Sequence, residues 1–255
     1  MNETLLAVKE VSKYFGGLKA LDRIDFEVKS GEILGLIGPN GAGKTVCFNL
    51  ISGVYGSSSG KIMFNGRRTD GTASHQVAKL GVGRTFQIVK PFASLSVLEN
   101  VLVARGIARY QNFVKIWSSW KSKSERQKGL RMLERVGLAD LAHRKAGLLP
   151  LGNLRRLEIA RALTVGTRLI LLDESFSGLR HEEITNLEAL IRGIRDDGTA
   201  VLLIEHNMRV AMKLCDRLVV LDHGRKIAEG SPEAIRQDER VVEAYLGRKE
   251  AGNAA

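Results

Sequence analysis

The chain has 255 residues, of which 44% are hydrophobic and 26% charged. This balance provides a substantial core and excludes disordered and fibrous chains. No apolar run approaches the roughly 18 residues of a membrane-spanning helix. The first residues lack a signal-peptide pattern, and Cys47 and Cys215 have no motif spacing, so we expect a reduced cytosolic chain.

The positive charge is concentrated in one part of the sequence. The formal net charge is +11. The segment from Arg105 to Arg131 contains eight Lys or Arg residues and one acidic residue, Glu125, so this segment supplies +7 of the total. The segment also contains Trp117 and Trp120. Two interpretations remain open: a helix that faces a membrane surface or a partner, or a solvated helical face with inward tryptophans.

In chain order, the hydrophobic pattern alternates between strands and helices. Strands are expected at 5–11, 24–28, 32–38, 61–66, 82–86, 169–174, 200–206 and 217–222. Helices are expected at 44–52, 75–81, 182–195 and 208–215, with residues 94–165 mostly helical and a helical tail at the end. Apolar strands that alternate with helices predict an α/β fold with a mainly parallel sheet, interrupted by an inserted α-helical block.

A glycine-rich loop follows the strand at 32–38. Residues 38–45 read GPNGAGKT, which matches the P-loop pattern between an apolar strand and a helix. The glycines let backbone amides converge on phosphates at a helix N-terminus. Lys44 would reach the β- and γ-phosphates, and the Thr45 hydroxyl would bind Mg²⁺. The alternative is a glycine turn that only links strand to helix, which would not require the Lys-Thr pair.

Three further strand ends carry polar residues. LILLDES at 169–175 ends in Asp173, which would hold the metal through water, and Glu174, which would orient or deprotonate the attacking water. Gln87 and His206 follow two other strands, at the edge where parallel sheets bind ligands. Taken singly, these residues would be explained as helix caps or strand ends.

The order of these motifs resembles the nucleotide-binding subunit of ABC transporters over residues 5–247. SKYFGGLKALD, GVGRTFQ, RRLEIARAL, LLIEHNM and GRKIAEGSPE are similar to the branched-chain (hydrophobic) amino acid transport subfamily. The resemblance implies a P-loop NTPase (RecA-like) core with an N-terminal antiparallel β subdomain and an inserted α-helical subdomain. The core with its β subdomain would span 5–92 and 166–247, the helical subdomain 93–165, and a polar tail 248–255.

The resemblance also implies roles for individual residues. Phe15, or Tyr14 in its place, would stack on adenine, and His206 would contact the γ-phosphate as a catalytic residue beside Glu174. Gln87 would sense Mg²⁺ together with Thr45 and Asp173. The residues expected to hold ATP are Phe15, Gly38, Asn40, Gly41, Gly43, Lys44, Thr45, Gln87, Pro150 and Gly152.

The implied partners are two membrane-spanning permease subunits, a sister ATP-binding subunit and, indirectly, an extracytoplasmic substrate-binding protein. The chain would lie at the cytoplasmic face of the inner membrane as a peripheral ATPase, with ATP and Mg²⁺ and without nucleic acid. The alternatives are a slow regulatory nucleotide-binding subunit, or the ATPase of a urea, aromatic-acid or lipopolysaccharide-export system. An ATPase acting on nucleic acid would fit the charge, but it usually has two nucleotide domains or a long coiled-coil insertion.

Three stretches depart from the family pattern. The signature LSGGQ is replaced by LPLGN at 149–153, the proline after Asp173-Glu174 is Ser175, and Arg180 and His181 stand where Asn or Asp and Pro are usual. In this family the signature turn of one chain contacts the ATP of the other. We therefore expect a heterodimer with a sister chain that carries an intact signature, although a homodimer remains open.

Overall fold

The computed structural model describes residues 3–87, 89–109, 122–164 and 166–251, and these ranges contain two β-sheets. The first sheet is antiparallel, with strand order β2-β1-β4-β5. It comprises β1 (Thr4–Phe15), β2 (Leu18–Lys29), β4 (Ser59–Phe64) and β5 (Arg67–Arg68). β1 and β2 are longer than predicted because a tight turn at Gly16 (φ 56°) joins them into one hairpin.

The second sheet contains six strands in the order β10-β9-β3-β8-β7-β6. They are β3 (Ile33–Ile37), β6 (Val82–Arg84), β7 (Leu169–Asp173), β8 (Ala200–Ile204), β9 (Arg217–Asp222) and β10 (Arg225–Gly230). All neighbours run parallel except β10, which pairs antiparallel with β9. The predicted mainly parallel sheet is confirmed. β6 is shorter than the predicted strand and ends before Gln87, which lies in the following loop.

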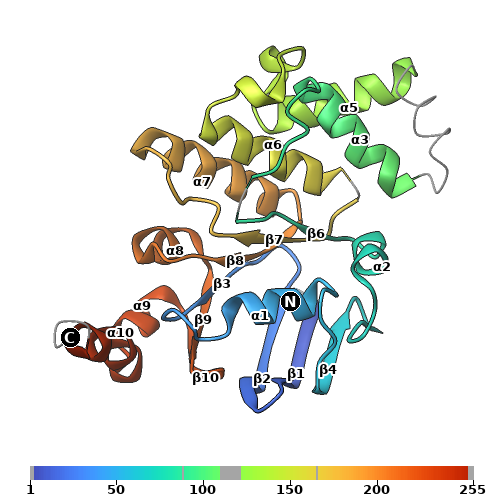
Figure 1. Ribbon diagram of the computed structural model, residues 1–255. Coiled ribbons are helices and arrows are strands. Elements are labelled where there is room, and N and C mark those ends of the chain that lie inside the picture. The colour runs from blue at the N-terminus through green and yellow to red at the C-terminus, as the bar shows by residue number, and fades with distance from the viewer. Residues whose placement is uncertain (1–2, 88, 110–121, 165, 252–255) are drawn as a thin grey trace.

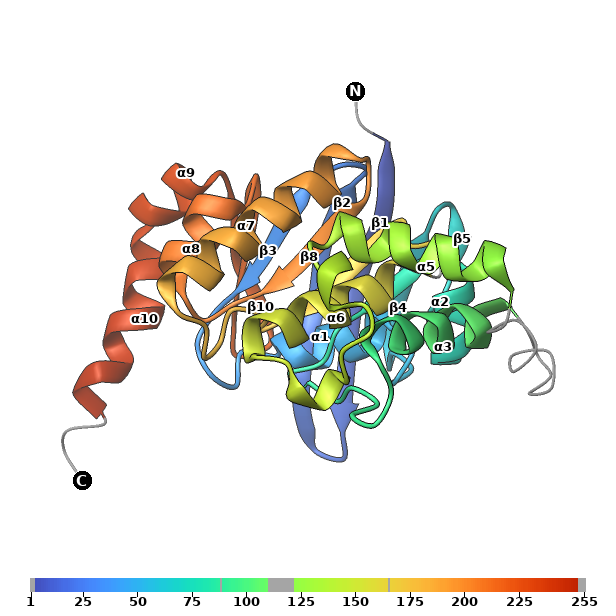
Figure 2. The ribbon, with the colours of Figure 1, turned by 90° about the horizontal axis from the view of Figure 1, so that it is seen from above.

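Nine described α-helices surround these sheets (Figure 1). They are α1 (Lys44–Ile51), α2 (Ser74–Lys79), α3 (Val97–Arg109), α5 (Lys123–Arg135), α6 (Leu151–Leu163), α7 (His181–Asp196), α8 (Met208–Leu214), α9 (Pro232–Gln237) and α10 (Glu239–Ala251). Short 3-10 turns occur at Ala139–Leu141 and Ala146–Leu148. Figure 2 shows α3, α5 and α6 grouped together and apart from α8, α9 and α10. The helical block inserted between β6 and β7 is therefore as expected.

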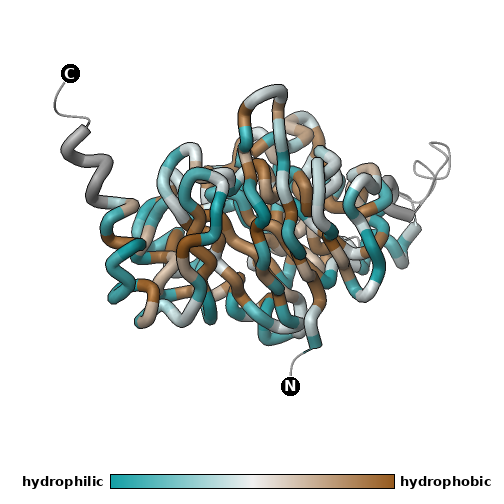
Figure 3. The backbone as a smooth tube through the Cα atoms, turned by 90° about the horizontal axis from the view of Figure 1, so that it is seen from below, coloured by the Kyte–Doolittle hydropathy of each residue, from teal (hydrophilic) through white to brown (hydrophobic). Residues whose placement is uncertain are grey.

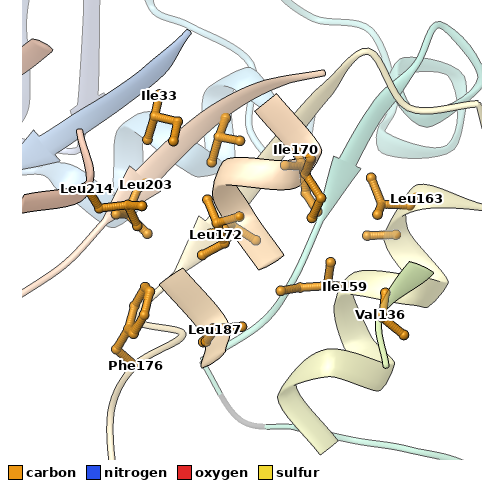
Figure 4. Close-up of a cluster of buried hydrophobic side chains, with 14 of the residues drawn as sticks. Ile33, Val136, Ile159, Leu163, Ile170, Leu172, Phe176, Leu187, Leu203 and Leu214 are labelled. Carbon is orange, nitrogen blue, oxygen red and sulfur yellow. The ribbon is translucent and has the colours of Figure 1, made fainter. Parts of the chain in front are cut away.

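The six-stranded sheet lies between two hydrophobic cores, because successive side chains of each strand point to opposite faces. In β3, Ile33 and Ile37 enter the core with α6, α7 and α8, whereas Leu34 and Leu36 enter the core with α1 and the antiparallel sheet. Figure 4 shows the first core, in which Leu203 of β8 lies beside Leu214 of α8 and in the same cluster as Ile33 of β3. In Figure 3 the hydrophobic colour follows the interior strands, and the outer turns are mostly hydrophilic.

Within the described part of the basic segment, Glu125 partly neutralises the positive charge. Glu125 in α5 accepts hydrogen bonds from Arg105 at 3.1 Å and from Lys128 at 2.9 Å. Trp117 and Trp120 lie outside the described residues, so both interpretations of the segment stay predictions. Within the described ranges, none of the helices has both the length and the apolar character that crossing a bilayer demands.

Candidate functional site

The P-loop lies between β3 and α1, and its glycines are required by the backbone. Gly38, Gly41 and Gly43 all have positive φ, at 147°, 80° and 100°. A Cβ on Gly38 would lie 2.0 Å from the carbonyl oxygen of Leu221, and one on Gly43 would lie 2.6 Å from Leu21 Cδ2. At Gly38 and Gly43, only glycine combines these dihedral angles with so little space. The loop is thereby fixed against β9 and β2.

Lys44 begins α1 and crosses the loop. Its Nζ donates to the carbonyl oxygens of Gly38 at 2.7 Å and Pro39 at 2.9 Å, and the residue is 6% exposed. The ammonium group is thus held over the loop, at the positive end of α1, where anions are favoured. The amides of the first helical turn, including that of Thr45, have no carbonyl partner within the helix.

Glu174 joins three separate segments of the chain. Gln87 Nε2 donates to Glu174 Oε2 at 2.8 Å, and His206 Nε2 lies 2.5 Å from Glu174 Oε1. Glu174 has φ 49°, a left-handed conformation that costs roughly 1–3 kcal/mol in a non-glycine residue. Its amide donates to Ile204 of β8 at 3.0 Å, which holds this conformation. The predicted convergence of Gln87, Glu174 and His206 is present because β6, β7 and β8 are neighbours.

Asp173 lies beside an arginine that the sequence analysis did not single out. Arg84 Nη2 is 3.3 Å from Asp173 Oδ2, and Arg84 Nη1 donates to Asn49 and Ser52 at 2.7 and 2.8 Å. Burial raises the pKa of Asp173, and the Arg84 guanidinium opposes this effect. Arg84 therefore links α1 to the end of β7 and compensates a carboxylate that is 5% exposed. The sequence indication for Arg84 was its position at the end of β6, because β6 pairs in parallel with β7, which ends in Asp173.

Two pockets meet at Thr45. A pocket of about 560 Å³ is lined by the P-loop, including Lys44 and Thr45, and by Glu174 and His206. A larger pocket of about 880 Å³ is lined by Thr45, Gln87 and Asp173 and extends between α2, α3 and α6. Thr45 therefore lines both the pocket of the predicted phosphate-binding residues and the pocket of the predicted metal ligands.

Comparison with known proteins agrees with this arrangement. The sequence profile described as ABC transporter matches residues 21–177, and that described as Branched-chain amino acid ATP-binding cassette transporter matches residues 225–251. The high-affinity branched-chain amino acid transport ATP-binding protein LivG of Salmonella typhimurium is 40% identical over 253 residues, 97% of this chain and 99% of LivG. The chain belongs to the ABC transporter family.

A second relative and a solved structure give the same result. The high-affinity branched-chain amino acid transport ATP-binding protein BraF of Pseudomonas aeruginosa is 39% identical over 253 residues, covering 97% of this chain and 99% of BraF. A crystal structure of the ADP conformation of an ATP-binding cassette of an ABC transporter aligns with a TM-score of 0.86 at 30% identity. It covers 96% of this chain and 99% of that one. The fold of this chain is therefore that of an ABC cassette.

The two candidates for the adenine contact of this ABC cassette lie at the hairpin turn between β1 and β2. Phe15 pairs with Leu18 and Tyr14 with Lys19, and both partners line the P-loop pocket. Phe15 is 41% exposed, and its ring meets Tyr55 edge-on at a centroid distance of 5.4 Å. The two aromatic residues are therefore strand partners of residues that line the pocket, and the choice of Phe15 stays a prediction.

The signature turn of the ABC family is formed here by the start of α6. Pro150 is its N-cap residue, and Leu148 and Leu151 are 62% and 38% exposed. Gly152 is covered, because a Cβ there would lie 2.5 Å from Glu183 Oε1 of α7. This contact places the Glu183 carboxylate of the same chain beside the N-terminus of α6.

The two other departures from the family pattern have structural explanations. Ser175 is 1% exposed, and its hydroxyl lies 3.5 Å from that of Thr85, so the position normally occupied by proline is a buried polar contact here. Arg180 is the N-cap residue of α7, and its amide donates to Glu183 Oε2 at 2.9 Å. Helix α7 is thus capped by its own glutamate without Asn or Asp at position 180.

Glu205, immediately before His206, is a buried carboxylate that the sequence analysis did not single out. It is 3% exposed, and its Oε1 accepts the Phe176 amide at 3.1 Å. Burial raises the pKa of Glu205 to about 7, while amides of Phe176, Asn207 and His206 oppose the shift. The carboxylate joins the loop after Glu174 to the loop that carries His206.

We predict that Glu205 makes stability depend on pH. The folded chain holds the Glu205 proton more tightly than the unfolded chain, so its contribution is complete below the unfolded pKa and is lost as pH rises through about 7. Relative to Glu205→Gln, the wild type should lose roughly 2 to 3 kcal/mol of unfolding free energy between about pH 5 and pH 8. Urea unfolding of both proteins at the two pH values measures this, and parallel curves would contradict it.

Proposed function

We propose that this chain hydrolyses ATP at the pocket formed by the P-loop, Glu174 and His206. The observation that carries this proposal is the Glu174 carboxylate, held by Gln87 and His206 at the edge of the pocket that contains Lys44. The P-loop amides and Lys44 bind the phosphates. Glu174 accepts a proton from the attacking water, and His206 positions Glu174 and contacts the γ-phosphate.

The proposal includes Mg²⁺, for which the chain offers suitable donors. Thr45, Gln87 and Asp173 carry oxygen atoms, which Mg²⁺ prefers, and all three line one pocket. Bound there, Mg²⁺ would neutralise charge on the phosphates. The raised pKa of buried Asp173 fits a site that gains from a neighbouring cation.

We propose branched-chain or other hydrophobic amino acids as the transported substrates. The support is the function of the relatives LivG and BraF in branched-chain amino acid transport, together with the match of residues 225–251 to the branched-chain family. Selection of the substrate would belong to the membrane subunits and a substrate-binding protein outside the cytoplasm. The chain itself would lie at the cytoplasmic face of the inner membrane, where ATP is available, and would bind no nucleic acid.

We propose that the 880 Å³ pocket receives a segment of a membrane subunit. Phe86 and Phe92 are 59% and 44% exposed in the loop after β6, and the pocket is lined by Lys79, Lys90 and Arg161. An exposed aromatic group beside clustered basic residues fits an amphipathic segment with an acidic residue. The loop between this pocket and Glu174 contains Gln87, so a segment seated there would act on the hydrolysis site.

We further propose that a sister ATP-binding chain pairs with this one. In the family arrangement the start of α6 would face the nucleotide of the partner, and here Glu183 already covers Gly152. A carboxylate beside that helix N-terminus weakens its attraction for phosphate. The pair would then contain a strong site, formed by this P-loop and Glu174 with an intact partner signature, and a weaker site closed by LPLGN.

Reconstitution tests this function. We expect the chain to co-purify with its two membrane subunits and sister ATPase, and vesicles containing the complex to take up leucine when ATP is supplied. The complex should hydrolyse ATP faster than this chain alone. Cooperative hydrolysis by this chain alone at the rate of the complex would refute the proposed heterodimer. Uptake of other solutes but not of leucine would refute the proposed substrate class.

A further inference from the structure

Arg155 in α6 holds the backbone of the loop that carries Gln87. Its Nη1 donates to the carbonyl oxygen of Phe86 at 3.1 Å, and its Nη2 donates to that of Gln87 at 3.0 Å. Arg155 is 5% exposed, so the contact is shielded from water. The planar guanidinium contacts two successive carbonyls with two nitrogens, which fixes both the position and the orientation of this backbone.

Glu158, one turn further along α6, completes the contact. Its carboxylate is 7% exposed and lies 3.5 Å from Arg155 Nη1. Burial raises the pKa of Glu158, and the Arg155 charge opposes the shift. Glu158 therefore supports the guanidinium that holds the carbonyls of Phe86 and Gln87.

A third contact lies at the far end of α6. Arg161 Nη1 donates to the carbonyl oxygen of Lys90 at 3.1 Å, and its guanidinium lies 5.2 Å from the centroid of the Phe92 ring. The helix spans about 20 Å from the signature turn to its last residue, because an α-helix rises 1.5 Å per residue. One rigid element therefore carries the signature turn at its start and fixes the Gln87 loop along its length.

We propose that Arg155, supported by Glu158, is a positioning residue for hydrolysis. It attaches the backbone at 86–87 to α6, so that the position of α6 sets whether the Gln87 amide reaches Glu174. The signature turn and the catalytic carboxylate are thereby linked within one chain. This inference rests on the proposed role of Glu174 in ATP hydrolysis.

The test compares Arg155→Gln and Arg155→Lys with wild type in the assembled complex. Because Arg155 contacts no P-loop atom, Arg155→Gln should lower kcat about tenfold and leave the KM for ATP within about twofold. Arg155→Lys keeps the charge but replaces the planar guanidinium, which reaches both carbonyls in a fixed geometry, by a compact ammonium on a flexible stem, so its kcat should be intermediate. Arg156→Gln is the matched control. The Arg156 guanidinium points elsewhere, since a Cβ on Gly137 would lie 3.2 Å from its Nη1.

A double-mutant cycle with Gln87→Ala separates positioning from general stability. If Arg155 acts through the Gln87 side chain, Arg155→Gln should have little further effect on kcat in the Gln87→Ala background. Multiplicative losses, or an unchanged kcat in Arg155→Gln, would overturn the proposal. Should Arg155→Gln fail to fold, the same cycle with Arg155→Lys gives the answer. Absence of hydrolysis in the wild-type complex would instead refute the proposed function.

Discussion

Replacing Glu174 by Gln is expected to lower kcat for ATP hydrolysis about a thousandfold while leaving ATP affinity within about threefold. The amide has nearly the shape of the carboxylate, so the pocket beside Lys44 should remain intact. It cannot accept a proton from water, and it cannot accept hydrogen bonds on both terminal atoms. Gln87 and His206 contact separate oxygens of Glu174. In the variant, the amide oxygen can still accept from Gln87, and the amide nitrogen then keeps its contact with His206 only when His206 Nε2 is unprotonated and accepts.

Two measurements separate these consequences. Steady-state hydrolysis reports kcat, and titration calorimetry with ATP and Mg²⁺ reports affinity in the non-hydrolysing variant. Glu134→Gln, at an exposed position of α5, is the control for the loss of one negative charge. A Glu174→Gln chain that hydrolyses ATP at the wild-type rate would show that another group takes the proton, and Glu174 would then have a structural role only.

The parts of the site that were predictable are those that follow from strand order. GPNGAGKT fixes a loop between β3 and α1 by local backbone chemistry alone. Glu174, His206 and Gln87 each lie just beyond one of three neighbouring parallel strands, so their meeting follows once a parallel sheet is inferred. The same reasoning did not predict β10, because its residues RKIAEG alternate too weakly to mark an edge strand.

The contacts that were not predicted depend on side-chain directions between distant segments. Arg155 reaches the carbonyl of Gln87 across 68 positions of sequence, and Arg84 reaches Asp173 across 89. Backbone carbonyls are present at every residue, so no residue pattern marks which one an arginine will contact. Glu183 over Gly152 likewise depends on how closely α6 and α7 approach. Such contacts appear only when the helices are placed in space.

A second large effect is expected at Gly43. Replacing it by Ala puts a Cβ 2.6 Å from Leu21 Cδ2 and 2.8 Å from the carbonyl oxygen of Ala20, at φ 100°. Since β2 is fixed by its pairing with β1, the P-loop and the first turn of α1 would have to move. We expect the free energy of unfolding to fall by about 3 kcal/mol or more and ATP binding to weaken at least about a hundredfold.

Gly41→Ala is the matched control, because it isolates the dihedral angle from the close approach. Gly41 also has a left-handed φ of 80°, but a Cβ there would meet no atom within 4 Å. We expect a loss of about 1 kcal/mol for this variant and a smaller change in ATP affinity. Urea unfolding and calorimetric titration of both variants give the comparison. Equal losses would mean that backbone strain alone selects glycine in this loop, whereas a larger loss at Gly43 would show that the contact between the P-loop and β2 sets the position of the phosphate site.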